Sequence, residues 1–210
     1  MNWKDRTAYA FIKTTKGKAQ QVWDRLKTWD NMIGTWIVTG EYDVVAWFDA
    51  KNWDAIHDSI ETIKGWAEVE DTNTHMVHNG YKTGKWWWER PVGAWTLIKE
   101  NYLDEASKNF YNWNWVTSGA SIPGDWDYMA WIEGDNWEEV WNHFMELKSK
   151  DWRASALVPI KSWWNQNWKH NWWTEDYTQS TTTDEYKPND TTDEYRTDEN
   201  KYETKENQFY

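Results

Sequence analysis

The order of apolar and polar positions predicts strands and helices in alternation from the start of the chain. Ala8–Ile12 is apolar throughout and contains β-prone residues, which predicts a buried strand. The next segment has the three- and four-residue spacing of a helix face. Its apolar positions are Ala19, Val22, Leu26 and Trp29. Residues 35–38 and 44–48 then predict a hairpin, joined by the glycine-containing loop 39–43.

A second helix and a last extended segment complete this unit. The helix carries Trp53, Ile56, Ile60 and Ile63 on one face, and Gly65 stands where a helix C-terminus is expected. Residues 69–77 are β-prone. The resulting order, β-α-β-β-α-β, is that of a ferredoxin-like α+β domain, in which two helices cover one face of an antiparallel sheet.

The same pattern occurs twice. Thr39–Trp47 recurs 84 positions later as Pro123–Trp131, and Ala8–Ile12 is echoed by Ala94–Lys99. The apolar helix positions Trp53, Ile56, Ile60 and Ile63 recur as Trp137, Val140, Phe144 and Leu147. A repeat of this length can bury its own core, so we expect two tandem ferredoxin-like domains, at residues 1–84 and 93–162. They are called the first and second repeat below.

The first repeat resembles the ligand-binding domain of the Lrp/AsnC regulators. The residues that carry the resemblance are Lys16-Gly17 after the first strand, the loop Thr39-Gly40-Glu41-Tyr42-Asp43, and the close Val69-Glu70-Asp71-Thr72-Asn73-Thr74. Residues 93–160 resemble a more diverged second domain of this kind. The resemblance implies that the repeats pack as a pseudo-dimer, a dimeric α+β barrel, and that the protein forms homo-oligomers. No helix-turn-helix fits before Ala8, so we expect a stand-alone domain pair that does not bind DNA.

Three further segments are rich in tryptophan or in acidic residues. Residues 85–92 predict a linker, and its Trp86, Trp87 and Trp88 are expected to pack between the repeats. Residues 163–173 predict a helix with a stripe formed by Trp164, Trp168 and Trp172, which docks on its own domain or on a neighbouring subunit. Residues 174–210 hold 11 acidic and 4 basic side chains and almost no aliphatic ones, which predicts a disordered acidic tail.

Composition narrows the function. The chain has 23 tryptophans and only five leucines, so we expect tryptophan to serve as a bulk core residue. The net charge of -12 opposes binding to nucleic acid or to an anionic membrane. There is no cysteine, which excludes thiol chemistry. No leader or apolar span is evident, so a cytoplasmic protein is expected.

The predicted binding site is the loop Gly40, Glu41, Tyr42 and Asp43, facing the strand with Thr72 and Thr74. Gly40 lets the backbone approach a ligand, free amides suit a carboxylate, and Glu41 and Asp43 suit an ammonium group. An amino acid carries both charges. Gly124, Asp125 and Asp127 are expected to form a weaker second site, because Pro123 removes an amide donor. Asp43 and Asp127 are also suited to closing their loops.

We expect no enzyme activity, cofactor or metal. The common nucleophile, phosphate-binding and dinucleotide motifs are missing, and His75 and His78 would point to opposite faces of a strand. Two alternatives remain open. The protein could be a self-assembling scaffold or filament, driven by exposed edges and tryptophans. It could also be a haem-binding member of the dimeric α+β barrel proteins, although the sequence offers no convincing axial histidine.

Overall fold

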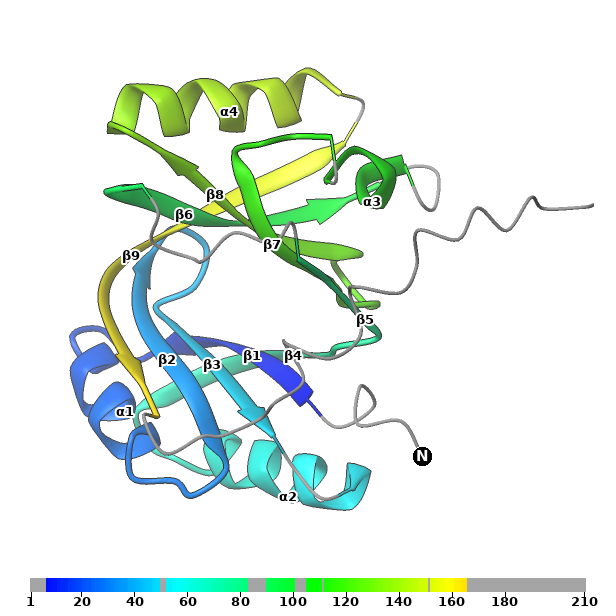
Figure 1. Cartoon of the computed structure of the whole chain (residues 1–210). Helices are drawn as coiled ribbons and strands as arrows, with labels where there is room; N and C mark the ends of the chain where they lie inside the picture. The colour runs from blue at the N-terminus through cyan, green and yellow to red at the C-terminus, as the bar shows by residue number, and fades with distance from the viewer. Residues whose placement is uncertain are drawn as a thin grey trace, which may run out of the picture. The chain divides into compact units, whose positions relative to one another are not determined.

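Each repeat has the predicted order β-α-β-β-α-β, and the first repeat adds one short strand after it (Figure 1). The computed structural model describes residues 7–49, 52–82, 90–100, 105–110, 112–150 and 152–165. The first repeat contains β1 (Thr7–Thr14), α1 (Ala19–Leu26), β2 (Met32–Thr39), β3 (Val44–Asp49), α2 (Trp53–Lys64), β4 (Val69–Met76) and β5 (Asn79–Lys82). The second contains β6 (Val92–Lys99), α3 (Glu105–Phe110), β7 (Val116–Ser121), β8 (Tyr128–Gly134), α4 (Trp137–Ser149) and β9 (Arg153–Trp164).

The strands of both repeats form one nine-stranded sheet with the order β4-β1-β3-β2-β9-β6-β8-β7-β5. The link is β9. Its first half pairs with β6 of its own repeat, and its second half pairs with β2 of the first repeat, where Gly34 lies opposite Trp164. The segment β4–β5 crosses in the other direction, because β4 pairs with β1 and β5 pairs with β7. Each repeat therefore completes the sheet of the other, and the predicted pseudo-dimer is confirmed.

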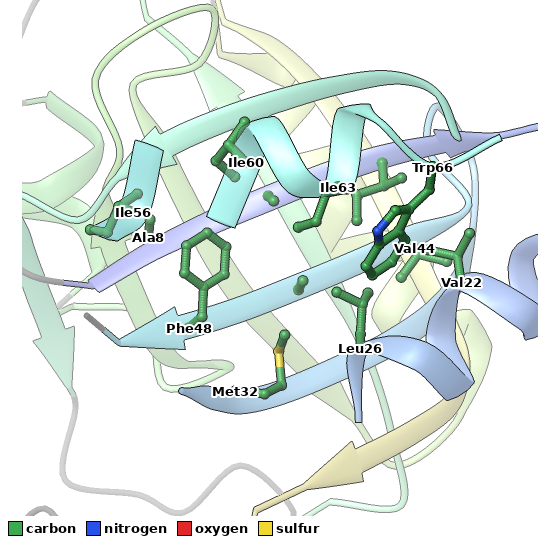
Figure 2. Packing of buried hydrophobic residues seen from close by; sticks show 13 residues of the cluster. Ala8, Val22, Leu26, Met32, Val44, Phe48, Ile56, Ile60, Ile63 and Trp66 are labelled. Atoms are coloured by element: carbon green, nitrogen blue, oxygen red, sulfur yellow. The ribbon is translucent and has the colours of Figure 1, made fainter. Parts of the chain in front are cut away.

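The helices cover the outer faces of the two sheets, with α1 and α2 on one and α3 and α4 on the other (Figure 1). Figure 2 shows Ile56, Ile60 and Ile63 of α2 directed at the sheet, where they meet the side chains of Val44 and Phe48. Both long helices begin in the same way. The side chain of Asn52 accepts a hydrogen bond from the Ala55 amide (2.9 Å), and that of Asn136 accepts one from the Glu139 amide (3.0 Å).

Aromatic side chains fill the space between the sheets. Tyr9 meets Trp95 of the other repeat edge-on at 6.1 Å between ring centroids, and Trp36 meets the same ring at 5.6 Å. Trp95 is 1% exposed. The expectation that tryptophan acts as a bulk core residue is confirmed at eight buried positions. These are Trp23, Trp36, Trp47, Trp66, Trp95, Trp115, Trp126 and Trp152.

One predicted element is wrong at its start. Trp163 and Trp164 belong to β9, not to a helix, because the open edge of β2 offers them backbone hydrogen bonds opposite Thr35 and Gly34. Three predictions lie outside the described residues: the packing of Trp86–Trp88, the roles of Trp168 and Trp172, and the acidic tail.

Candidate functional site

The loop after β2 is closed by an aspartate that reaches back to the first strand. Oδ2 of Asp43 accepts hydrogen bonds from the Thr14 amide (2.7 Å) and the Thr14 hydroxyl (3.1 Å), and the Asp43 amide donates to the Ile12 carbonyl (3.0 Å). Gly40 has a φ of +123°, and a Cβ there would lie 2.6 Å from the Ala156 carbonyl oxygen of β9. The predicted loop-closing role of Asp43 is therefore confirmed, and Gly40 lets the loop lie against the other repeat.

The loop after β7 is built on the same plan. Oδ2 of Asp127 accepts a hydrogen bond from the Glu100 amide (2.9 Å), and Lys99 donates to Oδ1 of Asp127 (2.7 Å) and to the Gly124 carbonyl (2.9 Å). Gly124 has a φ of +151° and lies against the ring of His75 on β4. Each loop thus contacts the crossing strand of the other repeat.

Asn73 of β4 joins the two loops. Its Nδ2 donates to the Tyr42 hydroxyl (3.1 Å) in the first loop and to Oδ2 of Asp125 (3.1 Å) in the second. Arg153, at the start of β9, makes a matching link from the other side. Its guanidinium lies 3.9 Å from Oε1 of Glu41 and stacks 4.4 Å from the ring centroid of Trp126.

These contacts define a single polar seam between the repeats, which we call the loop seam. It consists of Glu41, Tyr42, Asn73, Asp125, Trp126 and Arg153. Two carboxylates, one guanidinium and one carboxamide meet there, and Lys13 adds a second cation 5.5 Å from the Tyr42 ring. Opposite charges are therefore available to a ligand that carries both signs.

The structure brings together only part of the predicted site. Glu41, Tyr42 and Asp125 lie in the loop seam, whereas the carboxylates of Asp43 and Asp127 bond to backbone amides beside it. Thr72 and Thr74 lie opposite Ile12 and Ala10, whose side chains belong to the cluster under the helices. Cross-strand neighbours point to the same face of a sheet, so both threonines point away from the loops.

Sequence reasoning missed Asn73, Trp126 and Arg153. The alternation along β4 could have identified Asn73, because it lies between the two threonines and therefore points to the opposite face. Trp126 could have been identified from the repeat, because it is the equivalent of Tyr42, 84 positions later. Arg153 gave no comparable signal, since its position depends on how the repeats pack.

His75 supports the same region from the interior. It is 1% exposed, its Nδ1 donates to the Ile122 carbonyl (2.8 Å), and its ring meets Phe11 edge-on at 5.6 Å. Burial lowers the pKa of His75, and this outweighs the raising effects of the Ile122 carbonyl and of Asp125. The ring is therefore held in the neutral form where it contacts the second loop.

Two cavities lie away from the loop seam. A groove of about 470 Å³ runs between α2 and β4 and includes Thr74 and Met76 in its wall. A cleft of about 250 Å³ lies beside β9. Its wall includes Trp36, Arg90, Trp131, Lys161 and Trp164. Neither of these two cavities is lined by a loop-seam residue.

Fold and seam together define the class of protein: two ferredoxin-like units in one chain, arranged as an α+β barrel with a polar seam between their loops. Residues 7–87 match the family model of the Lrp/AsnC ligand binding domain. The first repeat thus has the fold of a small-molecule-binding regulatory domain.

One solved structure extends the likeness in fold to both repeats. The siroheme decarboxylase NirDL is 10% identical, with 74% of this chain and 71% of that chain covered and a TM-score of 0.58, which shows a common fold. TTHA0845 from Thermus thermophilus is 25% identical over 36% of this chain and 96% of its own, with a TM-score of 0.35. No curated protein matches the sequence. In the part of the chain that is described, no helix is long and apolar enough to cross a membrane.

Proposed function

We propose that this protein binds a small amino-acid-type molecule at the loop seam and that binding regulates how the two repeats are held together. The observation that carries the proposal is the meeting of Glu41 and Arg153 with Asn73 and Asp125 at one seam. The match of residues 7–87 to a ligand-binding family supports it independently.

The chemistry of the seam suits a zwitterion. The Arg153 side chain is 64% exposed and the contact of its guanidinium with Glu41 is long, at 3.9 Å, so the guanidinium is available to a ligand carboxylate. Glu41 and Asp125 can accept hydrogen bonds from the ligand ammonium group, and Asn73 can serve either end. Each ligand charge then gains a partner of opposite sign, which offsets the cost of removing it from water.

Binding is proposed in place of catalysis. The six side chains of the loop seam contain no serine, cysteine or histidine, so they form no serine–histidine or cysteine–histidine pair. Because the ligand contacts residues of both repeats, its binding would strengthen the link between them and raise the stability of the closed barrel.

Isothermal titration calorimetry against the twenty amino acids tests the proposal. We expect at least one to bind, and we expect Arg153→Gln and Asp125→Asn each to weaken it about tenfold or more, through the loss of one charge-assisted hydrogen bond. Glu61→Gln, on the exposed surface of α2, is the matched control and should bind as the unmodified protein does. Unchanged affinity in both seam variants would move the site elsewhere, and no binding by any amino acid would refute the proposal.

A further inference from the structure

The outer surface of α4 carries a line of large apolar side chains. Trp137, Trp141 and Met145 are 49%, 59% and 44% exposed. Their spacing of four places them in one row along the helix, beside the face on which Val140, Phe144 and Leu147 are buried against the sheet. The ring centroids of Trp141 and Phe144 are 6.1 Å apart. We call these three exposed residues the α4 stripe.

The fold itself does not require the α4 stripe. The equivalent positions of α2, 84 residues earlier, hold Trp53, His57 and Glu61. The buried face of α2 keeps the same apolar pattern, so a helix in this position packs equally well with polar residues outside. Two adjacent large apolar side chains in place of His57 and Glu61 are typical of a surface that another molecule covers.

Charged residues flank the α4 stripe in a self-complementary order. Glu138 and Lys148 are both exposed, and neither has an ion pair among the described residues. Both lie equally far from His143, one on each side along the helix. Trp141 and Met145 are also equidistant from His143, which places all four residues in a symmetric arrangement about one point.

We infer that the α4 stripe is an interface with a second copy of this chain, in which two α4 helices pack antiparallel about a two-fold axis level with His143, whose own ring lies on the far side of the helix, stacked on Trp115. This geometry sets Trp141 against the partner's Met145, and Glu138 against the partner's Lys148. Both contacts occur twice because the interface is isologous. The sulfur–aromatic contact and the ion pair both favour the antiparallel direction.

The expected dimer is weak. Three half-exposed side chains offer on the order of 300 Å² per subunit, well below the roughly 800 Å² per partner of a standard interface. We therefore expect association in the range of about 10 to 100 μM, which sedimentation equilibrium can follow.

The decisive variant is Trp141→His with Met145→Glu, which gives α4 the residues of α2. Since α2 folds with these residues, we expect the variant to remain folded by circular dichroism and to lose the dimer, with association weakened more than tenfold. The control is Trp53→His on α2, which removes an exposed tryptophan outside the α4 stripe and should leave association unchanged.

A charge exchange tests the direction of packing. Glu138→Lys and Lys148→Glu should each weaken the dimer, and the double variant should restore it, because each lysine then again meets a glutamate of the partner. A protein that is monomeric up to about 1 mM would overturn the inference. So would a dimer that Trp141→His with Met145→Glu leaves intact, or a double charge variant that stays as weak as the single ones.

Discussion

The two loops are closed by the same kind of hydrogen bond within each repeat, but they pack against different groups of the other repeat. Asp43 and Asp127 each bond to the backbone amide at the end of the first strand of their own repeat. Their amides also donate to equivalent carbonyls, those of Ile12 and Ile98. The contacts with the other repeat differ, because Gly40 lies against the Ala156 carbonyl, whereas Gly124 lies against the His75 ring. The aspartate that closes the loop is therefore the same in both repeats, whereas the residues that contact the other repeat differ. A binding seam with different chemistry on its two sides is the result.

The largest effect on stability should come from replacing with alanine the glycines that contact the other repeat. Gly40→Ala should lower the free energy of unfolding by about 3 kcal/mol and Gly124→Ala by about 2 kcal/mol, since both have a positive φ but only the first would meet backbone, which cannot rotate away. Urea denaturation would measure both. Gly17→Ala is the control, because Gly17 has a φ of +79° with nothing within 4 Å, and its loss should be about 1 kcal/mol. Equal losses at Gly40 and Gly17 would show that the contact with Ala156 is unimportant.

Removing the loop-closing aspartates should have the next largest effect. Asp43→Ala and Asp127→Ala each leave a backbone amide of a buried residue, Thr14 or Glu100, without its acceptor, at a cost of about 2 kcal/mol. Thermal unfolding of the two variants should give similar losses. Of the two aspartates, only Asp127 pairs with a lysine, at 2.7 Å. Only the stability lost in Asp127→Ala should therefore become smaller as salt is added. The same salt dependence at Asp43 would contradict this account.

The smallest effect concerns pH. His75 has a pKa below its ordinary 6.5, so the unfolded chain binds more protons than the folded one as the pH falls below 6.5. The contribution of neutral His75 is therefore complete above pH 6.5 and is lost as the pH falls through the lowered pKa. His75→Gln should reduce the difference in melting temperature between pH 8 and pH 5. His143, whose pKa burial also lowers, contributes with the same sign, so His143→Gln measures its separate share. An unchanged pH profile in His75→Gln would refute the assignment to His75.

The sequence was sufficient for the elements that depend on local pattern. The two helices with asparagine caps, the glycine-containing loops and the buried faces of the strands follow from periodicity and turn chemistry. The pairing between repeats does not. Residues 79–82 show no alternation of apolar and polar residues, and the spacing of Trp164 with later tryptophans favours a helix, yet both segments pair with strands of the other repeat.

The residues of the candidate site fall into the same two groups, those that local pattern predicts and those that depend on how the repeats pack. Glu41, Tyr42 and Asp125 were predicted because they follow the loop motif within each repeat. Trp126 belongs to the same motif, as the equivalent of Tyr42. Asn73 and Arg153 meet the second loop only after the repeats have packed, and no pattern within a single repeat encodes that meeting.

The exchange of strands between the repeats also sets an order of events during synthesis. β2 leaves the ribosome early, but its neighbour in the sheet is the second half of β9, which ends at Trp164 and emerges more than a hundred residues later. Until then the nascent first repeat presents an unpaired strand edge, the surface on which chains aggregate or capture one another. Translation must therefore reach the end of the second repeat before the first can close, and a chain that stops between them would be released with that edge still open.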